Sequence, residues 1–296
     1  MNNTFKIITG FALLNMAHVA EAAHLTKEAD NAPNIIIFLT DDMGWGDMGV
    51  YGHSTIKTPH LDKFASEGML FTNCHSASAV CSPSRASILT GRTSYRCGFF
   101  SIHREGQQYP HIRETEITLP EVLKTKGYAT CHVGKWHLGS LKPEMKHPSP
   151  AAIGYDYWLA TQSNAKPSHL NPVNFYRNGK PVGEMKGFSS EIIVDEAIHW
   201  LESNQNEAPF FLSVWTHEPH TPIGTDKRFL ELYDEALDPV VREYYGNISQ
   251  LDYAFGKLMK WLERKGIKNN TLVIFASDNG PAWAQNHLDR IHESSG

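Results

Sequence analysis

Four short apolar segments of the chain have the pattern of strands that are buried on both faces of a sheet. Residues 34–40, Asn-Ile-Ile-Ile-Phe-Leu-Thr, are rich in β-branched side chains and lack the apolar–polar alternation of a half-exposed strand. Residues 128–133, 210–216 and 272–277 follow the same pattern. We therefore expect four parallel strands in the interior of one sheet.

Amphipathic segments lie between these strands. Residues 58–68 begin with Thr-Pro, which suits a helix start, and end with a glycine. A second helix is expected from about Ser189, and a third along the apolar positions of residues 244–262, with its stop at Gly266. The alternation of strands and helices predicts an α/β fold with a mainly parallel central sheet and helices on both faces.

Residues 142–186 break this alternation. They are rich in Pro, Asn, Gly and Ser and show little periodicity. We expect a long excursion of loops over the site, which selects the substrate together with residues 95–111.

Polar side chains with catalytic potential follow each of the four predicted strands. They are Asp41 and Asp42, then Lys135 and His137, then His217 and His220, and finally Asp278 and Asn279. Since ligands of open α/β sheets bind at the carboxyl ends of the strands, these side chains should converge. The convergence predicts a metal-assisted hydrolytic site.

Residues 81–91, Cys-Ser-Pro-Ser-Arg-Ala-Ser-Ile-Leu-Thr-Gly, carry the most specific motif of the chain. Ser82 and Pro83 suit a helix start and Gly91 its end, which places Cys81 at a helix N-terminus, a natural site for anions. Arg85, one turn further, suits an oxyanion or the nucleophile. A cysteine in this position, taken alone, is more often a core or disulfide residue.

The motif resembles a family signature. Residues 81–91 are similar to the sulfatase signature, in which Cys-x-Pro-x-Arg is followed by Leu-Thr-Gly, and residues 127–137, Gly-Tyr-Ala-Thr-Cys-His-Val-Gly-Lys-Trp-His, resemble the second signature of that family. The metal motifs stand in family order, so the resemblance covers nearly the whole mature chain. It implies an alkaline-phosphatase-like fold and the hydrolysis of sulfate esters of aryl compounds or carbohydrates.

The resemblance also implies an unusual nucleophile at Cys81. In the family, this cysteine is oxidised to Cα-formylglycine (3-oxoalanine) by a separate formylglycine-generating enzyme, which is thereby an implied partner. One hydroxyl of the hydrated aldehyde attacks the sulfur of the ester, and the other then expels sulfate, so that release is built into the covalent mechanism.

The resemblance assigns a metal site to Asp41, Asp42, Asp278 and Asn279, with the residue derived from Cys81. These are hard oxygen ligands, which favour Ca²⁺, or Mg²⁺, over zinc. Asp-Asp and Asp-Asn-Gly are also common turn sequences, so the interpretation depends on the motifs together.

The remaining matches concern the sulfate group and its protons. Lys135 and His137 match family residues that bind the nucleophile or the sulfate and deprotonate the second hydroxyl. His217 matches a histidine that contacts the sulfate or assists the leaving group. His220 either contacts the substrate or supports the neighbouring proline turns.

The start of the chain predicts export. Residues 1–22 contain a lysine, a mostly apolar stretch and an Ala-Glu-Ala cleavage site, the pattern of a signal peptide. We expect a mature chain from Ala23 that is secreted or periplasmic, without a membrane span. The net charge of −5 argues against a nucleic-acid partner. The remaining cysteines leave a Cys97–Cys131 bridge open.

The end of the chain departs from the family pattern. Sulfatases carry a further lysine after Asp-Asn-Gly and then a smaller C-terminal α+β domain, whereas residues 281–296 contain no lysine. We therefore expect residues 23–296 to be a catalytic domain that lacks this C-terminal part. Two alternatives remain: a phosphodiesterase or phosphonate hydrolase of the same superfamily, and a non-catalytic fragment that binds metal and sulfated glycans.

Overall fold

The computed structural model describes residues 32–204 and 208–281, and the predicted signal peptide at residues 1–22 lies outside them. The described strands form one seven-stranded sheet in the order β5-β4-β3-β2-β6-β1-β7. The strands are β1 (Asn34–Asp41), β2 (Ala129–Lys135), β3 (Tyr157–Thr161), β4 (Phe175–Arg177), β5 (Lys180–Gly183), β6 (Phe210–Pro219) and β7 (Thr271–Ser277).

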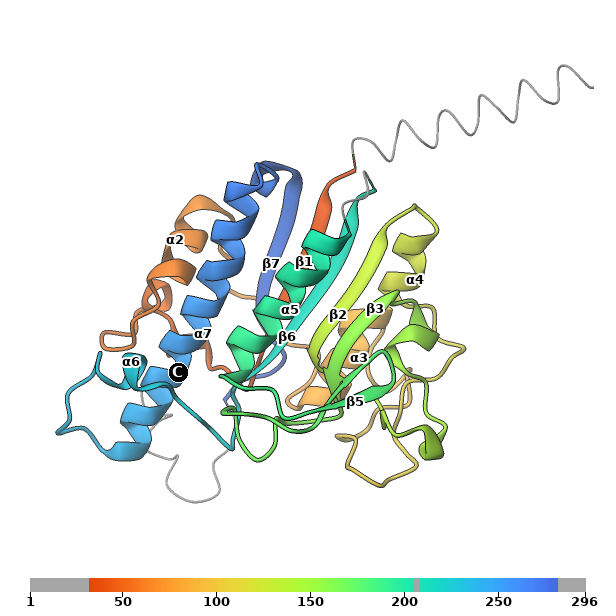
Figure 1. Ribbon diagram of the computed structural model, residues 1–296, viewed down its shortest axis with the longest axis horizontal. Coiled ribbons are helices and arrows are strands. Elements are labelled where there is room, and N and C mark those ends of the chain that lie inside the picture. Colours follow the sequence, from red (N-terminus) through yellow and green to blue (C-terminus); the bar gives the residue numbers. More distant parts are fainter. Residues whose placement is uncertain (1–31, 205–207, 282–296) are drawn as a thin grey trace, which may run out of the picture.

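The four predicted strands are confirmed as β1, β2, β6 and β7, but the expected interior position is wrong for β7, which forms an edge of the described sheet and exposes Leu272 and Ile274. They pair in parallel, with Ile36 of β1 opposite both Leu212 of β6 and Val273 of β7. The side chains of β6 are buried along its whole length, as expected of an interior strand without alternation. Their carboxyl ends point to the lower edge of the sheet in Figure 1, where the connecting loops gather.

Residues 142–186 were expected to be loops, and this prediction is wrong for three segments. β3 adds a parallel strand beside β2, and β4 and β5 extend the sheet as an antiparallel hairpin. β3 is only five residues long and almost wholly buried, so it is too short to show a period. The hairpin turns at Asn178 and Gly179, both at positive φ, which is the geometry that Asn-Gly favours in a two-residue turn.

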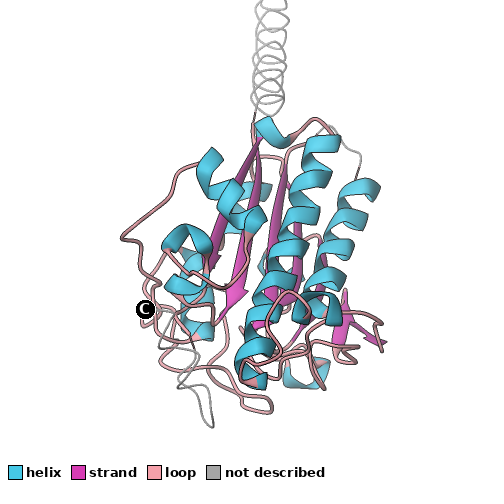
Figure 2. Cartoon of the chain, turned by 90° about the vertical axis from the view of Figure 1, so that its left-hand side faces the viewer, coloured by secondary structure: helices cyan, strands magenta, loops and turns pink. Residues whose placement is uncertain are grey.

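Helices cover both faces of the sheet, as Figures 1 and 2 show. α2, α5 and α7 pack on one face, where Phe255 of α7 meets the ring of Phe38 in β1, and α3 and α4 pack on the other. The helices are α2 (Pro59–Glu67), α3 (Cys81–Thr90), α4 (Leu119–Lys124), α5 (Ser189–Ser203), α6 (Lys227–Leu230) and α7 (Pro239–Arg264), with 3-10 turns η1 (Trp45–Asp47), η2 (Gly49–Tyr51), η3 (Pro143–Met145), η4 (Pro150–Ile153) and η5 (Lys268–Asn270). The expected fold class is confirmed.

The longest helix of the described residues, α7, begins earlier than its apolar pattern indicated. The carboxylate of Asp238 accepts a hydrogen bond from the backbone N–H of Val240 at 2.9 Å, and Pro239 occupies the first turn. This cap extends the helix upstream of Tyr244. No helix among the described residues is both long and apolar enough to cross a membrane.

The open question of a Cys97–Cys131 bridge is resolved against it. Both thiols are free. Cys131 belongs to the core cluster on the α5 and α7 face, whereas Cys97 packs in the cluster on the α3 face, so the sheet separates them.

Candidate active site

Cys81 occupies the first turn of α3. The preceding residue, Val80, is extended and provides no side-chain cap for the first backbone N–H groups of the helix, those of Cys81 and Ser82, whereas the N–H of Ser84 donates to the oxygen of Val80. Gly91 ends the helix in the left-handed conformation, with φ of 63°. The side chain of Cys81 is buried, with 6% exposed. The predicted placement of the cysteine at a helix N-terminus is confirmed.

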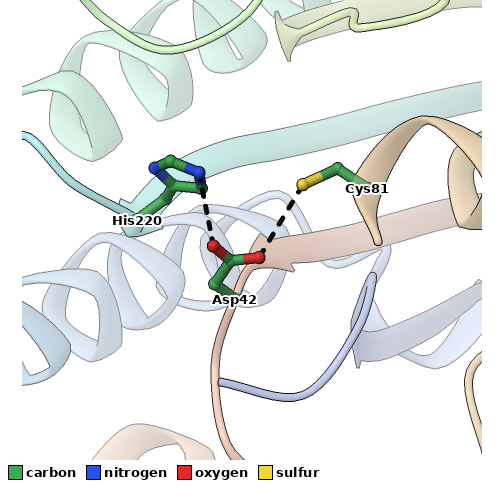
Figure 3. Close-up of side chains that lie close together, drawn as sticks. All are labelled: Asp42, Cys81 and His220. Carbon is green, nitrogen blue, oxygen red and sulfur yellow. Dashed lines mark hydrogen bonds and ion pairs between the residues drawn. The ribbon is translucent and has the colours of Figure 1, made fainter. Parts of the chain in front are cut away.

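Asp42 lies between Cys81 and His220, as Figure 3 shows. Its Oδ1 is 3.7 Å from Sγ of Cys81, and its Oδ2 is 3.3 Å from Nε2 of His220. Asp42 directly follows β1 and has a positive φ of 62°, a rare conformation for a residue with a side chain, which turns its carboxylate toward α3.

A cluster of buried ligand atoms surrounds this carboxylate. Asp41, Asp42, Asp278 and Cys81 each offer one atom, and these four atoms lie within 4.8 Å of one another. Asn279 donates from Nδ2 to Oδ1 of Asp42 at 2.5 Å, while its own Oδ1 is buried without a hydrogen-bond partner among the described residues. Carboxylate and amide oxygens with an unsatisfied acceptor fit a hard cation such as Ca²⁺ or Mg²⁺.

The positive charges of two buried side chains, Arg85 and Lys135, partly neutralise the carboxylates of the cluster. Arg85 donates from Nε to Asp278 at 2.8 Å and from an Nη to Asp41 at 3.2 Å. Lys135 contacts Asp41 at 2.6 Å and Sγ of Cys81 at 3.5 Å. Three carboxyl groups including Asp42 face two cations, and burial raises the pKa of Asp278 to about 7, so a divalent cation would stabilise the charged form of this acidic cluster.

Burial and neighbouring charges shift the protonation of the cluster. Burial raises the pKa of the Cys81 thiol, and the carboxylates raise it further, so the unmodified side chain stays protonated at neutral pH. Burial alone would raise the pKa of Asp41, but Lys135, His220 and Arg85 hold it well below its usual range. A buried thiol in an acidic environment is a poor nucleophile, because the thiolate is the reactive form.

A glycine allows β2 to bring Lys135 into the cluster. Gly134 has φ of 110°, and a Cβ atom there would lie 1.8 Å from the backbone oxygen of Trp215 in β6. Only glycine permits this approach, which places the side chain of the next residue at the carboxyl end of the sheet.

His137 lies two residues after Lys135 and has a positive φ of 58°. Its Nε2 donates to the backbone oxygen of His103 at 2.9 Å, since a carbonyl oxygen can only accept. Its Nδ1 is buried with no hydrogen-bond partner in the described part of the chain. Burial lowers the pKa of His137 well below its usual range, and the charges of Lys135 and Arg85 lower it further, so the ring is neutral.

His217 is fully buried near the end of β6, with both ring nitrogens beside hydroxyl groups. Nε2 lies 2.6 Å from Oγ1 of Thr161, and Nδ1 lies 2.6 Å from Oγ of Ser189. Thr161 donates its own proton to the oxygen of Ser163, so Nε2 of His217 is the donor and Nδ1 accepts from Ser189. The predicted contact of His217 with sulfate stays a prediction.

His220 joins the rim of the cluster. Besides its contact with Asp42, it lies beside Asn164, whose Nδ2 is 3.1 Å from Nδ1 of the ring.

The sequence did not predict three neighbours of the site, Thr161, His103 and Asn164. They lie in or near segments without periodicity. Only Thr161 had a possible signal in the sequence, because it is the last residue of a strand. The structure thus brings Asp41, Asp42, Cys81, Arg85, Lys135, His220, Asp278 and Asn279 into one connected cluster, with His137 and His217 at its edge.

Comparison with known proteins agrees with this arrangement. A profile of the sulfatase family matches residues 33–295. The chain is 36% identical to rat N-acetylgalactosamine-6-sulfatase over 87% of this chain and 52% of the relative, and 31% identical to the ulvan-active sulfatase of Formosa agariphila over 95% and 57%. The crystal structure of Ps i-CgsB in complex with k-i-k-neocarrahexaose is similar with a TM-score of 0.77 and 26% identity, over 86% of this chain and 61% of that one.

The fold belongs to the alkaline-phosphatase/sulfatase-like class. The chain belongs to the sulfatase family. It spans about half the length of the curated relatives that it matches.

Proposed function

We propose that the protein hydrolyses sulfate esters of carbohydrates with a formylglycine made from Cys81. The observation that carries the proposal is the position of Cys81: it lies at a helix N-terminus without a side-chain cap, 3.7 Å from the carboxylate of Asp42 and 3.5 Å from the ammonium group of Lys135. A tetrahedral anion at residue 81 would meet backbone N–H groups and a fixed positive charge there. Membership in the sulfatase family supports the same reaction.

A divalent cation, Ca²⁺ or alternatively Mg²⁺, would be held by Asp41, Asp42, Asp278 and Asn279 beside residue 81. The buried and unsatisfied Oδ1 of Asn279 supports this assignment. When bound, the ion supplies Lewis-acid polarisation of the sulfate oxygens and orients them.

Five side chains of the protein have proposed roles in binding the sulfate and transferring protons. Lys135 and Arg85 place fixed positive charges beside residue 81 and stabilise negative charge that develops on the sulfate oxygens. His137 is neutral and keeps Nδ1 without a partner, so it can accept a proton from a hydroxyl at residue 81. His217 and His220 flank the sulfate and the leaving group.

The proposed substrate class is supported by the names of the relatives and not by the geometry of the site. Two of them are named for sulfated sugars or polysaccharides, so we propose a sulfated glycan or monosaccharide as substrate. We also propose export from the cytoplasm as a secreted or periplasmic protein, and maturation by a formylglycine-generating enzyme that recognises residues 81–85, on the basis of the sequence motifs.

The test is sulfate release by protein that is co-expressed with a formylglycine-generating enzyme. Suitable substrates are N-acetylgalactosamine 6-sulfate and other sulfated monosaccharides, with the corresponding phosphate esters for comparison. We expect turnover of a sulfate ester, loss of turnover in Cys81→Ala, and no change in Cys74→Ala, which alters an exposed cysteine. Faster hydrolysis of phosphate esters, or activity that survives Cys81→Ala, would overturn the proposal.

A further inference from the structure

The orientation of His137 depends on a backbone group of a distant loop. Nε2 of its ring donates to the carbonyl oxygen of His103 at 2.9 Å. Because this oxygen cannot donate, the ring proton must sit on Nε2, and the lone pair of the neutral ring must sit on Nδ1. Nδ1 is the buried atom without a partner among the described residues.

The loop that carries this carbonyl is itself fixed to the helix of the nucleophile. The backbone N–H of His103 donates to Oγ of Ser82 at 2.9 Å, and Ser82 directly follows Cys81 at the start of α3. Both residues are buried, with 1% or less of their surface exposed. The hydrogen bond therefore ties the partner of His137 to the nucleophile's own turn.

The imidazole ring of His103 also makes hydrogen-bond contacts through both of its nitrogens. Nδ1 donates to the carbonyl oxygen of Pro110 at 2.7 Å, which leaves Nε2 as an acceptor facing Nε2 of Gln162 at 3.5 Å. The backbone carbonyl oxygen of Gln162 in turn accepts a hydrogen bond from the backbone N–H of His137 at 2.9 Å. The loop and His137 are thus joined at two separate points, which leaves the ring of His137 little freedom to turn.

We propose that Ser82 and His103 are positioning residues that hold His137 in the Nε2–H tautomer, with Nδ1 free to take a proton. The idea rests on the proposed role of His137 as the proton acceptor at residue 81. A ring with the wrong tautomer would present an N–H where a lone pair is required, and loss of the correct tautomer is costly in hydrolases that use a histidine base. In Ser82→Ala the N–H of His103 loses its acceptor, so the carbonyl that fixes the ring moves.

The tautomer can be measured without any catalytic assay. Long-range ¹H–¹⁵N correlation spectra of the purified protein distinguish a protonated Nε2 from a protonated Nδ1, and His137→Gln assigns the signals. We expect an Nε2–H tautomer in the wild type, and a detectable Nδ1–H population in Ser82→Ala. Protonated Nδ1 in the wild type, or an unchanged tautomer in Ser82→Ala, would overturn the proposal.

Kinetics then connects the tautomer to the reaction. We expect Ser82→Ala to lower kcat by at least about tenfold with little change in KM, because proton transfer and not binding is impaired. Rates are expressed per formylglycine, measured by peptide mass analysis, since Ser82 lies within the maturation motif. The matched control is Ser87→Ala on the same helix, because the Oγ of Ser87 has no hydrogen-bond partner among the described residues.

The two measurements separate the possible failures. If Ser82→Ala keeps the wild-type kcat per formylglycine, or loses no more than Ser87→Ala, the positioning role is wrong. If the wild type carries formylglycine but hydrolyses no sulfate ester, the proposed function fails, and the spectra still decide whether Ser82 and His103 set the tautomer of His137.

Discussion

Arg85 in α3 and Asp278 after β7 are joined by a hydrogen bond of 2.8 Å between Nε and Oδ2, although 193 residues separate them in the sequence. Both side chains are completely buried. The contact joins α3 to the carboxyl end of the sheet, and its two charged groups have no access to water. Removing only one partner of such a buried pair strongly destabilises the folded protein, because the other charge stays buried without a partner.

We therefore predict that Arg85→Met lowers the free energy of unfolding by about 3–5 kcal/mol, because Asp278 loses its buried ion-pair partner, whereas Asp41 keeps Lys135. Urea unfolding measures the change. Arg92→Met is the control, since the side chain of Arg92 is 46% exposed in its pair with Glu116 and should contribute about 1 kcal/mol or less. Equal losses in the two variants would show that burial of the Arg85 pair has no energetic consequence.

Calcium should stabilise the protein through the carboxylate cluster. A ligand that binds only the folded state raises the free energy of unfolding by about 2.7 kcal/mol at a hundredfold excess over its Kd. We expect thermal unfolding at a higher temperature with calcium than with a chelator, and no such difference in Asp42→Ala. Asp226→Ala, which alters the N-cap of α6, should keep the wild-type response. A calcium response that persists in Asp42→Ala would refute this ligand set.

The sequence was sufficient to predict most of the sheet and the cluster around Cys81. The four predicted strands are apolar runs, and each is followed directly by polar residues of the cluster, so a local pattern and one rule of α/β topology were enough. The carboxylates of Asp42 and Asp278 meet, for example, because β1 and β7 are adjacent parallel strands.

What escaped prediction depends on contacts that have no local pattern. β3 is too short for a period to show, and the pairing of β4 with β5 was signalled only by the dipeptide Asn178-Gly179. His103 lies in a loop, and its link to His137 is made through a backbone carbonyl, which any residue type possesses. Side-chain identity therefore gave no indication of that contact.

Stability should fall in mild acid because of His132. This residue of β2 is fully buried among aromatic rings, including that of Trp215, and burial lowers its pKa to about 3. The unfolded chain takes up a proton near the usual pKa of about 6.5, whereas the folded state does not, so stability decreases as the pH falls through this range. Between about pH 7.5 and 5.5 this one group should cost about 1.4 kcal/mol.

Unfolding in urea at both pH values checks this effect. His132→Phe keeps an aromatic ring but cannot titrate, so its loss of stability between the two pH values should be smaller than that of the wild type by about one histidine's contribution. His75→Gln, at an exposed position, should leave the wild-type difference in place. The same acid sensitivity in His132→Phe as in the wild type would assign the effect to other groups.

Gly134 offers a test of the geometry that places Lys135. Gly134→Ala puts a methyl group against the backbone oxygen of Trp215 and requires a positive φ from alanine. We predict a loss of about 2–4 kcal/mol in the free energy of unfolding, or a displaced strand end. Gly68→Ala is the matched control, because Gly68 has a negative φ of −129° at the end of α2 and room for a Cβ atom. If both variants unfold like the wild type, β2 and β6 are not as close as described.

The chemical state of residue 81 in active protein tests the account most directly. Protein is co-expressed with a formylglycine-generating enzyme, its sulfate release is measured, and the peptide that contains residue 81 is analysed by mass spectrometry and by labelling with an aldehyde-specific hydrazide. We predict an aldehyde at residue 81, with rates that rise in proportion to the labelled fraction and vanish in Cys81→Ala. Sulfate release by protein that carries only an unmodified thiol at residue 81 would contradict the account.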